Sequence, residues 1–372
     1  MSRHIVFLLP YADNRSPAGG FKVVYEYANR LVADGERVTI VYPAYADGRA
    51  DFSFRMSGLR TRWKQHVRLL HVWLRRLHCP DWFAVHREVS QRMVWSLEST
   101  RLPKADIYIA TAVQTATTLL KRDEIPPESK YYFIQSFEDW SGLTRAEVEA
   151  TWRYPFKKIV ISPWLQSIAQ ELQVEAALVK NGFDFDYFRC TESPQERDPL
   201  IIAAMYHTLE LKGWRETAEA LTLIRERKPS LRCLVFGAFP RGDDVPAWME
   251  YFQSPDRETH NHIYNTAAIY VAASHREGWG LTVGEAMQCG CAVACTDNAG
   301  FAAMAIHDET ALVSPVRDAP GLAEHILRLI EDDALRQRLA NAGHEFIKQF
   351  SWETSYCRLR EALSLAGISQ CH

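Results

Sequence analysis

The chain has 372 residues, of which 47% are hydrophobic and 24% are charged, and this composition is typical of soluble globular proteins. The length is sufficient for two domains of ordinary size. The net charge of −3 provides no general attraction to nucleic acid, so we expect no nucleic-acid partner.

Strand-like and helix-like segments alternate in the first half of the sequence. Residues 4–10 predict a buried strand, residues 21–34 predict an amphipathic helix that ends at Gly35, and residues 37–43 predict the next strand. Later segments of the same two kinds are residues 106–112, 131–135, 158–162, 163–172 and 177–180. This order is typical of a parallel sheet covered by helices, and it predicts a first α/β domain that ends near Lys180.

A second series of the same kind follows residues 189–198, which are polar, lack periodicity and are interpreted as a linker. Its predicted strands and helices are residues 200–206, 213–227, 231–237, 267–274, 292–296 and 319–350. The last helix is expected to be interrupted or kinked at Asp332 and Asp333. Two doubly wound domains result, and ligands of such domains bind at the carboxyl ends of the parallel strands.

The segment from Glu277 to Glu285 carries two carboxylates eight positions apart, between a predicted strand and a short helix. Glu277 is expected on the loop and Glu285 on the first helical turn. The first helical amides, near Leu281 and Thr282, form an anion site, and the flanking glycines allow a ligand to approach the main chain closely. The segment therefore fits both phosphate and sugar hydroxyls.

Five sequence pieces together resemble the retaining family 4 glycosyltransferases. They are SPAGG (16–20), VKNGFDFDYF (179–188), LKGW (211–214), SHREGWGLTVGEAMQCG (274–290) and FSWETSY (350–356). The resemblance implies the GT-B fold, an α/β architecture of two Rossmann-like, doubly wound domains that face each other across a cleft. It implies an acceptor-side domain over residues 1–180, a nucleotide-sugar-binding domain over residues 181–350, and a C-terminal helix over residues 351–372 that packs back on the first domain.

The resemblance also implies roles for three charged residues. Glu277 is similar to the residue that binds hydroxyls of the donor sugar, and Glu285 to the one that holds the nucleotide ribose. Lys212 is similar to the lysine that neutralises the departing diphosphate. A charged side chain taken singly is usually solvated surface, and only the surrounding motif favours these roles.

Glycines and backbone amides complete the implied donor site. Gly278, Gly280, Leu281 and Thr282 would present amides to the sugar and the diphosphate. Gly19 and Gly20 resemble the loop of the first domain that closes over the phosphates, although turn glycines often serve geometry alone. Asn181 is a weaker candidate, because Asn-Gly is first of all a turn signal.

The sequence departs from the family pattern at two places. His207 stands where the family usually has an arginine on the phosphates, so phosphate neutralisation would be weaker or supplied by another base. Residues 133–140, FIQSFEDW, stand where the family often has a histidine, and Gln135 and Glu138 are the candidates there. Glu138 is a candidate to receive the proton of the acceptor, and a loop carboxylate facing water is the alternative.

The function implied is retaining, metal-independent transfer of a hexose or deoxyhexose from a nucleoside-diphosphate sugar to a glycan or lipid-linked acceptor. The setting implied is cell-surface polysaccharide or glycoconjugate synthesis, with no cofactor besides the donor. In the segment FIQSFEDW and in the absence of the arginine, the sequence resembles a subgroup that includes bacterial surface-glycan rhamnosyltransferases. A deoxysugar donor is therefore a hypothesis. A GT-B nucleotide-sugar epimerase and a non-catalytic nucleotide-sugar-binding protein are the alternatives.

Residues 59–78 contain six Arg or Lys and no acidic residue, with apolar side chains on one helical face. This helix could contact an anionic membrane, pack on the first domain, or line the acceptor site. Cys289, Cys291 and Cys295 cluster without histidines and are interpreted as buried hydrophobic side chains rather than metal ligands. The N-terminus lacks a signal-peptide pattern, so we expect a cytoplasmic location, with the alternative of a peripheral position on the inner face of the membrane.

Overall fold

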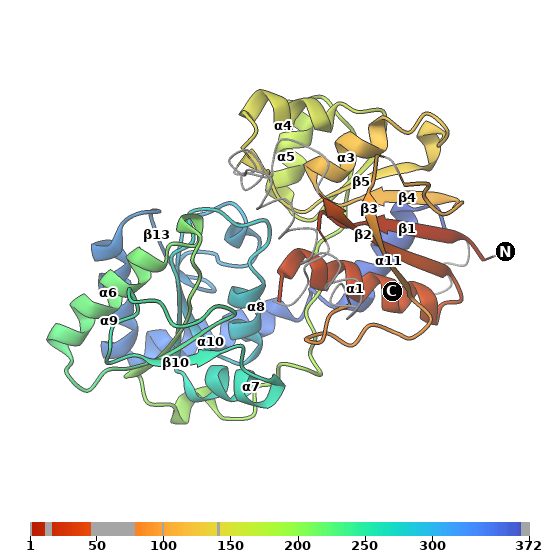
Figure 1. The fold of residues 1–372 in the computed structure, drawn as a ribbon. Helices are drawn as coiled ribbons and strands as arrows, with labels where there is room; N and C mark the ends of the chain where they lie inside the picture. The colour runs from red at the N-terminus through yellow and green to blue at the C-terminus, as the bar shows by residue number, and fades with distance from the viewer. Residues whose placement is uncertain (1, 12–16, 46–78, 99, 140–141, 366–372) are drawn as a thin grey trace, which may run out of the picture. The chain divides into compact units, whose positions relative to one another are not determined.

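The computed structural model describes residues 2–11, 17–45, 79–98, 100–139 and 142–365 (Figure 1). Two compact units are formed, one by Met1–Lys180 with Ser355–His372 and the other by Asn181–Thr354. The predicted basic helix at residues 59–78 lies outside the described residues. Among the described helices, none combines the length and the apolar character needed to cross a membrane.

The first unit contains a seven-stranded parallel sheet in the order β3-β2-β1-β4-β5-β6-β7. Its strands are β1 (His4–Leu8), β2 (Arg37–Tyr45), β3 (Ser90–Ser96), β4 (Ile107–Ala110), β5 (Lys130–Ile134), β6 (Lys157–Val160) and β7 (Ala176–Leu178). Its helices are α1 (Gly19–Ala33), α3 (Val113–Leu120), η1 (Pro127–Ser129), α4 (Arg145–Trp152) and α5 (Pro163–Glu171). The central strands β1, β4 and β5 are buried along their whole length, as expected for a parallel sheet covered on both faces.

The second unit contains a six-stranded parallel sheet in the order β10-β9-β8-β11-β12-β13. Its strands are β8 (Ile201–Met205), β9 (Arg232–Gly237), β10 (Glu250–Gln253), β11 (Ile269–Ala272), β12 (Ala292–Thr296) and β13 (Leu312–Ser314). Its helices are η3 (Pro194–Glu196), η4 (Glu210–Lys212), α6 (Trp214–Arg227), α7 (Arg257–Thr266), α8 (Leu281–Gln288), η5 (Phe301–Ala303), α9 (Ala319–Glu331) and α10 (Asp333–Ile347).

The strand order fixes where a site can form in this second sheet. From β8 the chain runs outward through β9 and β10, and it then returns to add β11, β12 and β13 on the other side. The loops that follow β8 and β11 therefore diverge from two adjacent strands. Crevices at such reversal points are the usual ligand sites of open α/β sheets.

Helix α11 (Trp352–Ala362) follows the second unit, and from Ser355 onward it belongs to the first unit. Within that unit its side chains bond to α1 and to the residue that follows it. The hydroxyls of Ser355 and Tyr27 lie 2.6 Å apart, and the Tyr356 hydroxyl donates to Oδ2 of Asp34, the C-cap of α1, over 2.8 Å. The return of the C-terminal helix to the first unit agrees with the fold that the sequence resemblance implied.

The interruption predicted in the last long helix is confirmed. Helix α9 ends at Glu331 and α10 begins at Asp333, because the Asp332 carboxylate accepts a hydrogen bond from Leu335 N over 2.9 Å and caps the new helix. The three clustered cysteines are all buried, as predicted. Within the part of the chain that the structure describes, no group of three or more His, Cys, Asp or Glu side chains could hold a metal ion.

Two expectations need correction. Glu285 is the fifth residue of α8 and so lies on its second turn, because the helix begins at Leu281. Residues 189–198 are not a free linker, because the buried guanidinium of Arg197 donates to the carbonyl oxygens of Tyr264, Ala267 and Cys289. This polar segment is therefore packed into the second unit.

Candidate functional site

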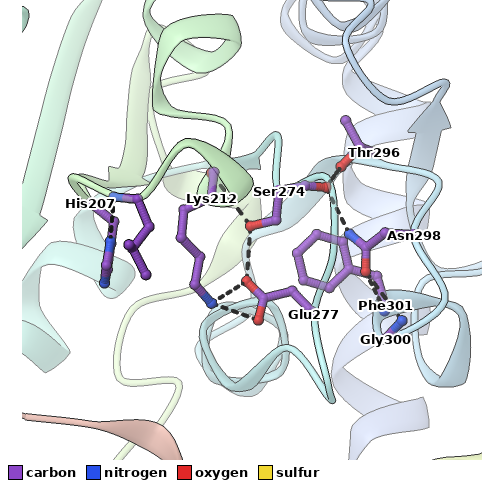
Figure 2. A network of polar contacts seen from close by, with 9 residues as sticks. His207, Lys212, Ser274, Glu277, Thr296, Asn298, Gly300 and Phe301 are labelled. Atoms are coloured by element: carbon purple, nitrogen blue, oxygen red, sulfur yellow. Dashed lines mark hydrogen bonds and ion pairs between the residues drawn. The ribbon is translucent and has the colours of Figure 1, made fainter. Parts of the chain in front are cut away.

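An ion pair between Lys212 and Glu277 forms the centre of the candidate site. Lys212 ends η4, after β8, and Glu277 lies in the loop between β11 and α8. Lys212 Nζ donates to both carboxylate oxygens, at 2.7 Å to Oε1 and 2.8 Å to Oε2 (Figure 2). The side chains are 22% and 13% exposed, so the pair is only partly screened by water. The strand reversal thus brings together two residues predicted from separate motifs.

Gly213 holds the two loops close to each other. It has a φ of 63°, and a Cβ at this position would lie 1.9 Å from the carbonyl oxygen of Ala273. His275 N also donates to Leu211 O over 2.8 Å, which joins the loop after β11 to η4. Only glycine permits this approach, so the LKGW motif positions Lys212 through its glycine.

Ser274, which the sequence analysis did not single out, contacts both members of the pair. Its hydroxyl lies 2.9 Å from Glu277 Oε1 and 3.4 Å from Lys212 O. Its carbonyl oxygen accepts hydrogen bonds from Thr296 Oγ1 over 2.6 Å and Asn298 Nδ2 over 3.0 Å (Figure 2). The only sequence signal was a serine at the end of a predicted parallel strand, and it does not reveal the contact with Glu277.

His207 also follows β8 and faces the same charges. Burial, together with the nearby Lys212 ammonium, lowers the pKa of His207 to about 4, although Glu277 opposes the shift. The imidazole is therefore neutral at pH 7, and its Nδ1 accepts a hydrogen bond from Leu209 N over 3.0 Å. Where the family pattern has a permanent positive charge, this chain has a neutral side chain.

The start of α8 has the geometry that the glycines predicted. Gly280 has a φ of 98°, and a Cβ there would lie 2.5 Å from the ring of Phe301. The amides of a first helical turn, here including Leu281 and Thr282, have no carbonyl four residues earlier within the helix. Glu285 is buried, with 6% of its surface exposed, so it is not a solvated surface charge. Gly278 lies in the loop that leads from Glu277 to this helix.

The remaining candidates lie in the first unit. Gly19 and Gly20 are the first two residues of α1, and Gln135 Nε2 donates to Gly20 O over 3.1 Å. Glu138 is half-buried, and its Oε2 accepts a hydrogen bond from Val113 N, the first amide of α3, over 3.0 Å. Burial raises the pKa of Glu138 to about 7, against the effect of the Val113 hydrogen bond. Glu138 is thus a helix-capping residue rather than a loop carboxylate facing water.

Asn181 is the first residue of the second unit, and only 2% of its surface is exposed. Its neighbour Gly182 packs on the backbone of Trp352, where a Cβ would lie 2.4 Å from Trp352 N. The Asn-Gly pair therefore serves the close packing of two chain segments, and it does not form the turn that the sequence suggested.

Comparison with known proteins gives a family match that lies within the second unit. Residues 191–346 match the model of the family described as glycosyl transferases group 1. The O-antigen chain mannosyltransferase B of Escherichia coli is 32% identical over 106 residues, which are 28% of this chain and 27% of that protein. The phosphatidyl-myo-inositol mannosyltransferase of Mycolicibacterium smegmatis is 25% identical over 249 residues, 61% of this chain and 64% of that protein. Both matches span less than two thirds of the relative's own length.

The structure of HepE from Anabaena in complex with UDP-glucose is similar over 97% of this chain and 99% of that chain, with a TM-score of 0.71 and 15% identity. The chain has the GT-B fold. The resemblance to family 4 glycosyltransferases is confirmed by the family match and by the two mannosyltransferase relatives. In this GT-B chain, the matched segment contains Lys212, Glu277, Glu285 and His207, whereas Gly19, Gly20 and Glu138 lie outside it.

Proposed function

We propose that this GT-B protein is a retaining glycosyltransferase. It moves a sugar from a nucleoside-diphosphate sugar to a glycan or lipid-linked acceptor in the synthesis of cell-surface polysaccharide or glycoconjugate. The observation that carries the proposal is the Lys212–Glu277 pair at the β8/β11 reversal, inside the segment that matches glycosyl transferases group 1. Both relatives are mannosyltransferases, which supports the transfer of a hexose.

The donor would be held by complementary groups of the second unit. Glu277 accepts hydrogen bonds from sugar hydroxyls, and Lys212 neutralises the diphosphate. The amides at the start of α8 add dipoles of the right sign for phosphate oxygens. Glu285 binds the ribose. His207, being neutral, contributes a hydrogen bond to the phosphates rather than a charge.

The reaction needs no protein nucleophile in this proposal. The acceptor hydroxyl attacks the anomeric carbon on the face that the diphosphate leaves, so the configuration is retained. The bond between that carbon and the phosphate oxygen breaks, and its electron pair goes to the diphosphate. The acceptor's proton passes to the diphosphate oxygen. Lys212 and the α8 amides stabilise the charge that develops on the leaving group, which is the main source of rate acceleration in such a site.

The first unit would supply the acceptor side. The family resemblance assigns Gly19 and Gly20 to the phosphates, and it makes Glu138 the candidate that assists the acceptor hydroxyl. The proposed mechanism uses no metal, and the proposed location is the cytoplasm. A peripheral contact with the inner face of the membrane through residues 59–78 is a hypothesis, with packing on the first domain and lining of the acceptor site as the alternatives. Sedimentation with anionic liposomes at low and high salt tests that contact, because electrostatic binding must weaken as salt increases.

Donor binding is the first test. The intact chain is titrated in the presence of chelator with UDP, GDP and dTDP and with UDP-glucose, GDP-mannose and dTDP-rhamnose, and its thermal unfolding is followed. A ligand at about a hundred times its dissociation constant stabilises the folded state by roughly 2.7 kcal/mol. A shift confined to one base and lost in Glu285→Ala supports the proposal. The absence of a shift with every donor contradicts it.

Transfer itself is then followed by NMR with the donor that binds and a panel of glycan and lipid-linked acceptors. Retention requires that the product has the same anomeric configuration as the donor sugar. An altered nucleotide sugar formed without an acceptor would instead identify an epimerase. Donor binding without any turnover would identify a non-catalytic nucleotide-sugar-binding protein.

A further inference from the structure

Ser274 is the link between the sheet of the second unit and the charged pair. It lies two residues beyond the end of β11, after Ala273, and is 3% exposed. A serine hydroxyl has one hydrogen to donate, and the carboxylate oxygen of Glu277 at 2.9 Å is a stronger acceptor than the carbonyl of Lys212 at 3.4 Å. The hydroxyl therefore donates to Glu277 Oε1.

This hydrogen bond makes the two oxygens of Glu277 different from each other. Oε1 accepts from both Ser274 and Lys212, whereas Oε2 accepts from Lys212 among the described residues. A carboxylate can accept about four hydrogen bonds in total. Oε2 thus keeps the greater capacity to accept further hydrogen bonds, and the bond at Oε1 prevents free rotation of the carboxylate.

The backbone of Ser274 is itself fixed by two buried side chains. Thr296 and Asn298, which are 1% and 5% exposed, both donate to its carbonyl oxygen. The side-chain Oδ1 of Asn298 in turn accepts from the backbone amides of Gly300 and Phe301, each at 3.2 Å. The side chains of Ser274, Thr296 and Asn298 are thus all hydrogen-bonded in one buried network, and such fully satisfied networks rigidify the side chains they contain.

We propose that Ser274 is a positioning residue that fixes the Glu277 carboxylate so that Oε2 accepts a hydroxyl of the donor sugar. The inference rests on the proposed function, because it assigns a task within the same donor site. Ser274 acts through Glu277 and touches neither the nucleotide nor the diphosphate. Its loss therefore weakens the hold on the sugar and leaves the binding of the nucleoside diphosphate unchanged.

The test compares two ligands on one protein. Isothermal titration measures the dissociation constants of the nucleoside diphosphate and of its sugar, with the pair taken from UDP/UDP-glucose, GDP/GDP-mannose or dTDP/dTDP-rhamnose. For Ser274→Ala we expect the constant for the nucleotide sugar to rise about tenfold, which corresponds to ~1.4 kcal/mol. The constant for the diphosphate alone should stay the same, and Ser274→Thr, which keeps the hydroxyl, should restore sugar binding.

Ser314→Ala is the matched control. Ser314 is also a buried serine at the end of a strand of this sheet, and its hydroxyl bonds to Cys295 O rather than to the charged pair. It should leave both constants unchanged. Thr296→Val, which removes the hydroxyl behind Ser274, provides a second route to the same result if Ser274→Ala fails to fold in thermal unfolding.

The outcomes separate this inference from the proposed function. If wild type binds the nucleotide sugar and Ser274→Ala binds it equally well, the positioning role is wrong while the function stands. Equal losses for the diphosphate and for its sugar would show a merely structural role and also overturn the inference. If wild type binds neither ligand of any pair, the proposed function fails, and the role of Ser274 fails with it.

Discussion

The close approach of Gly213 to Ala273 leads to a quantitative prediction for Gly213→Ala. An alanine at a φ of 63° would occupy the left-handed region, and its Cβ would lie 1.9 Å from a backbone oxygen that cannot rotate away. The left-handed conformation costs an L-residue about 1–2 kcal/mol. Overpacking adds about 1–3 kcal/mol, so the second unit should lose roughly 2–5 kcal/mol of stability.

Gly35→Ala is a matched control for the conformational part of this cost. Gly35 also has a positive φ, of 84°, but a Cβ there would have nothing within 4 Å. This variant should lose only about 1–2 kcal/mol, and in the first unit. The difference between the two variants isolates the contact between the loops after β8 and β11.

Hydrogen exchange of the intact chain, measured by mass spectrometry in increasing urea, reports each unit through its own peptides. Peptides that cover β8 and β11 should lose protection in Gly213→Ala, and those of β1 and β4 should keep it. Equal losses of stability in Gly213→Ala and Gly35→Ala would refute the reasoning, because the contact would then have no energetic weight.

Three further changes test other parts of the structure. Lys212→Gln removes a charge-assisted contact, so it should raise the dissociation constant of the nucleoside diphosphate about tenfold or more in titration calorimetry. Lys228→Gln is the control, because Lys228 belongs to a more exposed ion pair of the same unit, and it should leave this constant unchanged. Arg197→Met leaves buried carbonyl oxygens without their donor and should lower the free energy of unfolding of the second unit by about 3 kcal/mol or more, measured by urea denaturation. The pKa of Glu138 is about 7 in the folded protein, against an ordinary value of 4.5, so its carboxyl group ionises less readily in the folded state than in the unfolded state. As the pH rises from about 4.5 to 7, wild type should therefore lose stability relative to Glu138→Gln. Urea midpoints of both proteins at pH 5 and pH 8 measure this, and a constant difference would contradict it.

The sequence predicted those strands that are continuous apolar runs. Strands β1, β4 and β12 are buried throughout and lie where the predicted segments lie. The edge strands β3 and β10 were missed, because their residues are polar or half-exposed and become strands through pairing with β2 and β9. Edge strands lack the continuous burial that makes an interior parallel strand recognisable.

Two short helices were missed although their starts carry a sequence signal. Thr144 and Glu147 form a capping box at the start of α4, and Asp256 caps α7 through Thr259 N. Such caps precede helices that have few buried residues, where apolar periodicity is weak. Capping residues were therefore a better guide to these helices than hydrophobicity.

The sequence named the candidate residues of the site, but it did not predict how these residues are arranged in space. Lys212 and Glu277 are 65 positions apart, and their pairing depends on β8 and β11 being neighbours in the sheet. Which strands are adjacent depends on the strand order of the sheet, and the periodicity of single segments does not predict that order. Ser274 and Asn298 were missed for the same reason, because each acquires its role only through a contact between different loops.

The charges of the Lys212–Glu277 pair make sugar binding and diphosphate binding interdependent in the proposed function. Lys212 uses two of its three hydrogens on Glu277, and because His207 is neutral at pH 7, the attraction of the diphosphate acts on Lys212 and draws it away from Glu277. A partly buried carboxylate without a counter-ion is costly, so this change of partner is favourable only when other donors replace the ammonium. Ser274 already donates to Glu277 while the ion pair is intact, so the hydroxyls of the donor sugar must supply the replacement. When the sugar has left for the acceptor, Glu277 recovers Lys212, and the hold on the diphosphate product weakens. The same ion pair thus favours binding of the intact donor over retention of the product.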